Sequence, residues 1–143
     1  MKGLFLILVG FLFSSTYATE PLNIRVEALV ARDVIAKQPA DPNTVFPQDS
    51  GFLVLWTKVT AKQAPTAITH VWYYLGKEVM RVKLDVKSPR YRTWSRKTIE
   101  PDQQGKWKAE VLGPDGTVLA AVEFIVEAQK SSAGQEDPKT ATE

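Results

Sequence analysis

The chain has 143 residues, with 18 Lys and Arg side chains, 16 Asp and Glu side chains and no cysteine. This length allows one domain and little else, and the nearly balanced charge gives no field strong enough to indicate nucleic-acid binding. The absence of cysteine excludes disulfides, thiolate metal sites and thiol catalysis, so burial of apolar surface must stabilise the fold alone.

Residues 1–18 have the pattern of a secretory signal peptide. Lys2 precedes an apolar run over residues 4–13, and Thr16 and Ala18 then provide the small residues of a cleavage site. This run is too short to span a bilayer well. We therefore predict an exported protein, periplasmic or extracellular, whose mature chain begins near Thr19 and has no stable membrane span. An uncleaved N-terminal anchor is the alternative.

From Thr19 to residue 127, apolar side chains recur with a period of about two rather than about 3.6, which is typical of β-strands. Residues 37–51 are rich in proline and are predicted to form a long loop or a crossover between sheets. Residues 128–143 are polar without an apolar pattern, and a disordered tail is predicted there. The expected strands cover residues 24–30, 52–59, 68–75, 78–86, 91–99, 106–112 and 118–126.

The clearest hairpin is predicted around Gly76-Lys77, because glycine at the first position of a two-residue loop suits a type II′ turn. Since side chains alternate between the faces of a strand, this turn fixes which residues face the core, and a slip of one residue would exchange the two faces. The predicted pairs are Val71–Val82, Tyr73–Met80 and Leu75–Glu78 on the core face, and Trp72–Arg81 and His70–Lys83 on the other.

Seven short strands with regularly spaced turns and no amphipathic helix predict an all-β fold. The expected architecture is an immunoglobulin-like, two-sheet antiparallel sandwich over residues 19–127. A small closed barrel is the alternative. In the strand over residues 106–112, Trp107, Ala109 and Val111 are predicted to point inward.

The C-terminal strands contain a set of distinctive motifs. They are His70-Val-Trp72-Tyr73-Tyr74-x-Gly76-Lys77-Glu78-Val79, Arg90-Tyr-Arg92-Thr93-Trp94-Ser95, Gly105-x-Trp107, and Asp115-Gly116 with Leu119, Phe124 and Val126. Together these motifs resemble a bacterial family of domains of unknown function, the one numbered 2914. The resemblance implies an envelope-associated domain and brings no known activity, so no catalytic residue follows from it.

Catalytic and metal motifs are weak in this sequence. His70 is the single histidine, and Ser88 and Ser95 lack the glycines of a nucleophile elbow, so a structural histidine and no catalytic residue are predicted. The acids near residues 41–49 do not have the spacing of an EF-hand calcium loop, and the remaining acids are scattered. We therefore expect no metal site and no cofactor.

The most suggestive stretch runs from Pro89 to Lys97, where arginines alternate with aromatic residues. Arginine beside aromatic rings suits anionic or sugar ligands. If this strand neighbours the predicted hairpin, one sheet carries an aromatic–basic outer face; a core position for Trp94 is the simpler alternative. The candidate binding residues are His70, Trp72, Tyr74, Arg81, Arg90, Arg92, Trp94 and Arg96.

Three functions follow as hypotheses. The leading one is a non-enzymatic envelope module that contacts a protein partner through a sheet face or edge, with the edge of the strand over residues 24–30 as a second surface. The second is a module that binds a glycan or anionic envelope polymer by stacking on Trp72, Tyr74 and Trp94. A small hydrolase is the third, and it would require a serine and a carboxylate within hydrogen-bond reach of His70.

Overall fold

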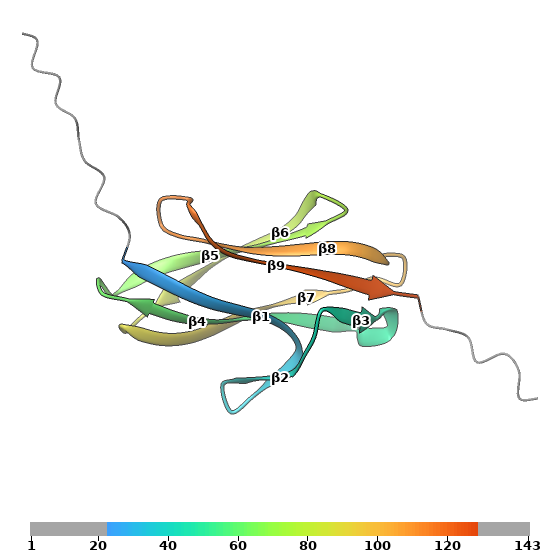
Figure 1. The fold of residues 1–143 in the computed structure, drawn as a ribbon, viewed down its shortest axis with the longest axis horizontal. Coiled ribbons are helices and arrows are strands. Elements are labelled where there is room, and N and C mark those ends of the chain that lie inside the picture. Colours follow the sequence, from blue (N-terminus) through green and yellow to red (C-terminus); the bar gives the residue numbers. More distant parts are fainter. Residues whose placement is uncertain (1–22, 129–143) are drawn as a thin grey trace, which may run out of the picture.

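A computed structural model describes residues 23–128 and shows two β-sheets packed face to face (Figure 1). The predicted all-β, two-sheet sandwich is confirmed. The predicted signal peptide and nearly all of the predicted polar tail lie outside the described residues. Within those residues, no helix has the length and apolar character needed to cross a membrane.

Sheet A has four strands and sheet B has five. Among the described residues, every pair of neighbouring strands is antiparallel except β3 and β9, which are parallel. Sheet A has the order β2-β1-β4-β7, with β1 (Ile24–Ile35), β2 (Gln38–Pro42), β4 (Phe52–Ala61) and β7 (Arg90–Thr98). Sheet B has the order β3-β9-β8-β5-β6, with β3 (Val45–Pro47), β5 (Thr66–Tyr74), β6 (Lys77–Val86), β8 (Gly105–Leu112) and β9 (Val118–Glu127).

The seven predicted strands correspond to β1 and β4–β9, and the segment over residues 37–51 contains two more. β2 extends sheet A, whereas β3 joins sheet B beside β9. This segment therefore crosses between the sheets, which is one of the two forms predicted for it. A 3-10 turn, η1 (Gln48–Ser50), then leads into β4. The prolines that indicated a loop are compatible with these strands because both are short edge strands.

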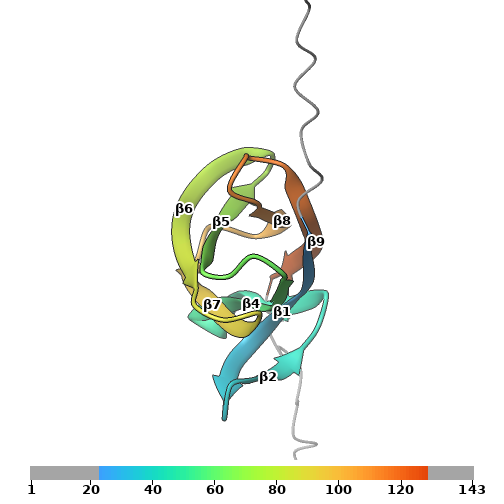
Figure 2. The ribbon, with the colours of Figure 1, turned by 90° about the vertical axis from the view of Figure 1, so that its left-hand side faces the viewer.

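The core lies between the sheets, where the alternating residues of both inner faces meet. Figure 2 shows the two layers from one end, with β6 and β7 on one side and β1 and β9 on the other. Trp107, Ala109 and Val111 are buried as predicted. Phe124 packs edge-on against Trp72 with ring centroids 6.1 Å apart. Burial of such rings contributes about 25 cal/mol per Å² of apolar surface.

The predicted register of the β5–β6 hairpin is wrong. The loop is Leu75-Gly76, both with positive φ (48° and 81°), as a type I′ turn requires. Tyr74 therefore pairs with Lys77, and a bulge follows between Trp72 and Tyr73. The bulge leaves Val79 without a partner on β5 and pairs Trp72 with Met80 and His70 with Val82, so the faces of β5 are exchanged relative to the prediction.

The corrected register places even-numbered β5 residues in the core. His70 and Trp72 are fully buried there, and Tyr73 lies on the outer face of sheet B. Met80 packs against the core as predicted. Val71 is also fully buried, although it lies on the outer face, because β5 is an interior strand between β6 and β8.

Candidate binding surface

β7 presents alternate residues to the outside of sheet A. Tyr91 packs against the core and Ser95 is buried on the inner face, so the even-numbered residues of β7 point outward. Arg90, Arg92, Trp94 and Arg96 therefore share the outer face, which is the single side that their alternation predicts.

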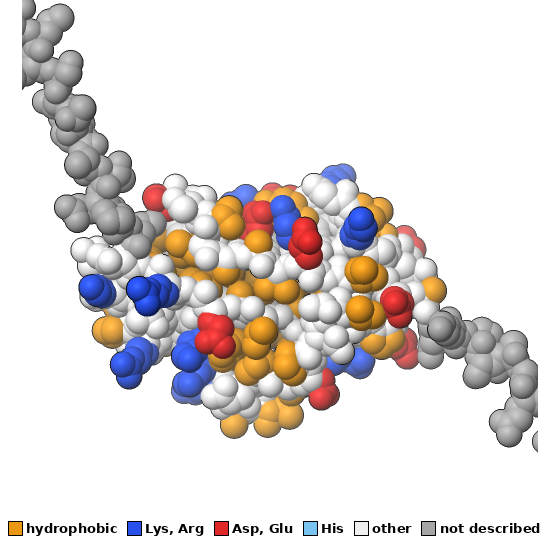
Figure 3. All heavy atoms as spheres, viewed as in Figure 1, with side chains coloured by type: hydrophobic (Ala, Val, Ile, Leu, Met, Phe, Trp, Pro, Cys, Tyr) orange, Lys and Arg blue, Asp and Glu red, His pale blue; other side chains and the backbone are white. Residues whose placement is uncertain are grey.

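The outer face of sheet A carries a basic cluster at the end where β1 begins and β4 ends. In two successive cross-strand rows, Arg25 lies opposite Thr60 and Thr60 opposite Arg90, while Glu27 lies opposite Lys58 and Lys58 opposite Arg92. We call Arg25, Lys58, Arg90 and Arg92 the basic cluster. Figure 3 shows Lys and Arg side chains gathered at this end of the molecule.

One acidic side chain lies among these rows. Glu27 pairs with Lys58 at 3.4 Å, and both side chains are at least half exposed. Such an exposed pair contributes at most about 1 kcal/mol, because water screens it. Within residues 23–128, Arg90 and Arg92 form no ion pair, so the positive charge of the cluster is largely uncompensated.

Next to the basic cluster, the outer face becomes apolar. The Trp56 indole N–H donates a 2.9 Å hydrogen bond to the Lys37 carbonyl, so the turn between β1 and β2 folds over Trp56 and leaves it 3% exposed. Trp94 lies directly opposite Trp56 on β7 and is half-buried. Its position is thus intermediate between the exposed platform and the core residue that the sequence allowed.

Arg96 lies on the outer face beyond Trp94, on the side away from the basic cluster. Its guanidinium pairs with Asp33 at 2.8 Å and lies 4.5 Å from the centre of the Phe52 ring. Both contacts hold Arg96 in place, whereas Arg92 has neither. Among the arginines of β7, only Arg90 and Arg92, at the start of the strand, therefore have side-chain charges without an ion pair in the described residues.

The eight predicted binding residues do not form one surface. His70 and Trp72 are buried between the sheets, and Arg81 lies on β6, where it pairs with Glu78 at 2.6 Å. Tyr74 donates a 2.8 Å hydrogen bond to the Gln104 carbonyl at one end of the sandwich. The prediction of a contiguous face is wrong because β5 and β7 belong to different sheets. The three rings proposed for sugar stacking are likewise separated.

His70 and Trp72 are instead joined to β7 through its inner face. The Trp72 indole N–H donates to Ser95 Oγ at 3.1 Å, and His70 Nδ1 lies 2.8 Å from the same oxygen. His70 Nε2 lies 3.3 Å from Thr57 Oγ1, whose hydroxyl donates to the Thr93 carbonyl at 2.8 Å. We call His70, Trp72, Ser95, Thr57 and the Thr93 carbonyl the polar network.

The donors and acceptors of the polar network assign the state of His70. Since the Thr57 hydroxyl donates to Thr93, the oxygen of Thr57 must accept a hydrogen from His70 Nε2. His70 Nδ1 then accepts from the Ser95 hydroxyl. The ring is neutral with its proton on Nε2. Burial lowers the pKa of His70 from 6.5 to about 3.

The contact between Ser95 and His70 brings together a hydroxyl and an imidazole, as a hydrolase would require. Both side chains are buried, at 6% and 0% exposure, and Ser95 also accepts from Trp72. The other partner of the imidazole is Thr57, not a carboxylate. This geometry links the two sheets across the core and gives substrate no access to the hydroxyl.

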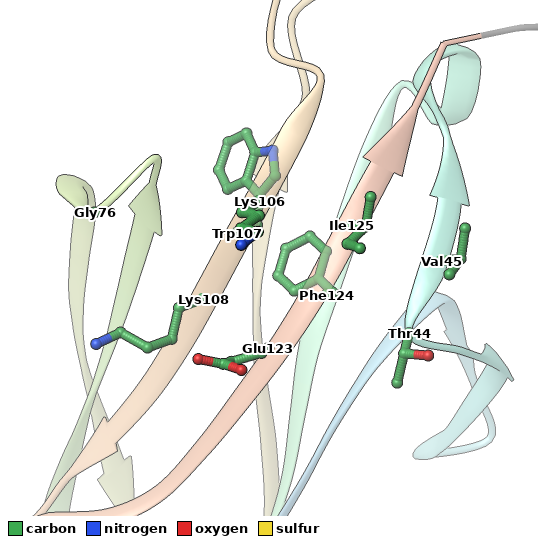
Figure 4. Close-up of a pocket in the computed structure, with 9 residues that line it drawn as sticks. All are labelled: Thr44, Val45, Gly76, Lys106, Trp107, Lys108, Glu123, Phe124 and Ile125. Carbon is green, nitrogen blue, oxygen red and sulfur yellow. The ribbon is translucent and has the colours of Figure 1, made fainter.

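A trough of about 490 Å³ on sheet B is a second concave feature (Figure 4). Val45 and Ile125 are exposed along it, and Lys106, Lys108 and Glu123 add charge of both signs. Lys108 hydrogen-bonds Glu110, which raises the pKa of its ammonium group, and it extends to within 4.6 Å of the Tyr73 ring centre. The trough thus favours neither an anionic nor a cationic ligand.

Metal-binding groups do not converge in the part of the chain that is described. No three His, Asp or Glu side chains between residues 23 and 128 are placed to hold one ion. Asn43, in the segment weighed for calcium, instead accepts hydrogen bonds from the backbone N–H groups of Thr44 and Val45.

Comparison with known proteins supports the family resemblance and the fold. Residues 65–126 match the family model described as Protein of unknown function (DUF2914), which confirms the resemblance found in the sequence. The matched segment covers nearly all of β5–β9. No curated protein matches the chain.

Two solved structures are similar to the chain at low sequence identity. The CARDB domain of the PF1109 protein from Pyrococcus furiosus, solved in complex with di-metal ions, is similar at 14% identity and a TM-score of 0.50 over 78% of this chain and 97% of that one. A mutant β-glucosidase from Listeria innocua with laminaribiose gives 8% identity and a TM-score of 0.49 over 78% of this chain and 17% of that one. The CARDB likeness supports the sandwich fold alone.

Proposed function

We propose that this chain is an exported, non-catalytic module that binds an acidic region of another envelope protein through the outer face of sheet A. The observation that carries the proposal is the basic cluster, in which four basic side chains occupy two neighbouring cross-strand rows with a single acid, Glu27. Like charges on neighbouring strands destabilise a sheet. A partner that supplies carboxylates would relieve this repulsion and gain charge-assisted hydrogen bonds.

Two further features support a binding role over catalysis. The imidazole and hydroxyl that could do chemistry are buried in the polar network, where each already has its hydrogen-bond partners. The half-buried Trp94 beside the cluster adds apolar contact area, and aromatic and arginine side chains together are enriched in protein interfaces. Export is supported by the signal-like order of residues 1–18.

The test is crosslinking in intact cells with the full chain as bait, followed by identification of captured proteins. The charge-reversal double variant Arg90→Glu with Arg92→Glu should lose the acidic partner. The control Lys77→Glu with Lys83→Glu makes the same change of net charge on exposed β6 positions and should keep it. Equal capture by both variants would contradict the proposal, as would a captured partner with no acidic segment.

Export is tested separately by cell fractionation and N-terminal sequencing. We expect the protein outside the cytoplasm with an N-terminus near Thr19. Recovery of the full-length chain from the cytoplasm would contradict this part of the proposal, whatever the result of the binding test.

A further inference from the structure

β7 differs from the other edge strands because it is long and regular and has no feature that prevents its free backbone groups from pairing with another chain. β2 has 5 residues with two prolines, and β3 has 3 residues and ends at Pro47. Short strands and prolines prevent pairing with another chain. β7 has 9 residues without proline, and its register with β4 is regular from Arg90 to Thr98.

The remaining edge strand, β6, is as long but is protected in two ways. The bulge at Trp72/Tyr73 disrupts its register, and bulges blunt edges. Its charged side chains are also of both signs, as in the pair of Glu78 and Arg81. Among the four edge strands in residues 23–128, β7 alone combines regular geometry with charged side chains that are all basic.

The hydrogen bonds of β4 define which β7 backbone groups are free. Ala61 N–H donates to the Pro89 carbonyl at 2.9 Å, and Ile99 N–H donates to the Gly51 carbonyl at 3.0 Å. Odd-numbered residues of β7 therefore direct their backbone toward β4. The N–H and C=O groups of Arg92, Trp94 and Arg96 point to the opposite edge, where no strand of the described chain pairs with them.

Arg92 and Arg96, whose backbone groups are free, also project basic side chains on the outer face. A second copy of β7 added here would bring arginine against arginine, which is unfavourable. An extended segment with alternating acidic residues would pair its backbone with β7 and place carboxylates against Arg90 and Arg92. We infer that β7 receives an extended acidic segment of the partner protein as an additional strand of sheet A, a mode that rests on the proposed function.

The test measures binding of the full chain to an eight-residue peptide in which glutamate alternates with valine. Arg92→Ala removes the charge and keeps the backbone N–H, whereas Arg92→Pro removes both. Proline is tolerated at an edge position whose N–H faces solvent. We expect Arg92→Pro to bind at least about fivefold more weakly than Arg92→Ala, the effect of one lost hydrogen bond.

Equal affinities for Arg92→Ala and Arg92→Pro would overturn strand addition while leaving charge-dependent binding, and thus the proposed function, intact. Absence of any charge-dependent binding would overturn both. Polygalacturonate, an anionic polymer without backbone amides, is the second probe, and tighter binding of this polymer than of the peptide would overturn the choice of a protein partner. Amide exchange of Trp94 and Arg96 in the wild-type chain provides a second readout, because saturating peptide should slow it.

Discussion

The inner and outer faces of β7 differ in how far their polar groups are satisfied. On the inner face, Ser95 and the Thr93 carbonyl belong to the polar network, in which every buried side-chain nitrogen and oxygen has a partner. On the outer face, Arg90 and Arg92 have no ion pair in the described residues. One strand thus holds the two sheets together on one side and leaves charge available on the other.

This difference predicts that substitutions on the two faces of β7 affect different properties, stability on one face and binding on the other. Substitutions on the inner face should change the free energy of unfolding and leave charge-dependent binding to the folded chain unchanged. Substitutions of Arg90 and Arg92 on the outer face should do the reverse.

The largest effect should come from pH through His70. Its pKa is about 3 in the folded chain, below the 6.5 of an exposed histidine, so the unfolded state takes up the proton first as pH falls. The contribution of the neutral ring to the free energy of unfolding is complete above about pH 6.5 and is lost toward about pH 3, by about 5 kcal/mol in all, at about 1.4 kcal/mol per pH unit. Denaturant titrations between pH 4.5 and 7 should show this slope for wild type and not for His70→Gln. Equal slopes would contradict the buried neutral state.

Ser95→Ala should destabilise the fold by about 3 kcal/mol. The change leaves His70 Nδ1 and the Trp72 indole N–H without their shared partner in the core, and each unsatisfied group costs about 1–3 kcal/mol. Ser88→Ala is the control, since Ser88 is half-buried beside the turn before β7 and bonds only the Arg90 carbonyl. Chemical denaturation measures both, and similar losses would contradict the network.

Trp56→Phe should cost about 1 kcal/mol more than Trp94→Phe. Both residues lie on the outer face, but Trp56 donates to the Lys37 carbonyl and is buried, whereas Trp94 is half-buried. Thermal unfolding of the two variants compares them. A larger loss for Trp94→Phe would show that the turn between β1 and β2 does not anchor on Trp56.

The double variant Arg90→Ala with Arg92→Ala should change stability by less than about 0.5 kcal/mol, because both side chains are exposed and unpaired. The same variant should weaken binding of the acidic peptide. A large loss of stability would mean that the two arginines serve the fold, and the contrast between the faces of β7 would disappear.

The sequence predicted the strands better than their relative placement. Alternation located β8 and β9 within a few residues because each has one clearly apolar face. It could not assign the faces of β5, which is apolar on both: Val71 and Trp72 are adjacent and both fully buried. The bulge between Trp72 and Tyr73 decides the face, and neither the alternation nor the turn residues indicate it.

The candidate site was predictable in part for a related reason. Residues that lie within one strand, such as Arg90, Arg92 and Trp94, share a face by alternation alone, and the structure agrees. Arg25 and Lys58 were missed because their proximity to β7 depends on the strand order of sheet A. The polar network was missed as well. The signal for this network in the sequence was a lone histidine, together with a serine and a threonine, at strand positions that alternate with apolar residues.

The most direct measurement is residue-resolved amide hydrogen exchange along β7 in the full chain without ligand. We predict fast exchange at Arg92, Trp94 and Arg96, whose N–H groups face the free edge. Slow exchange is predicted at Thr93 and Ser95, which pair with β4. Uniformly slow exchange along the strand would contradict a free edge and, with it, the surface on which partner binding depends.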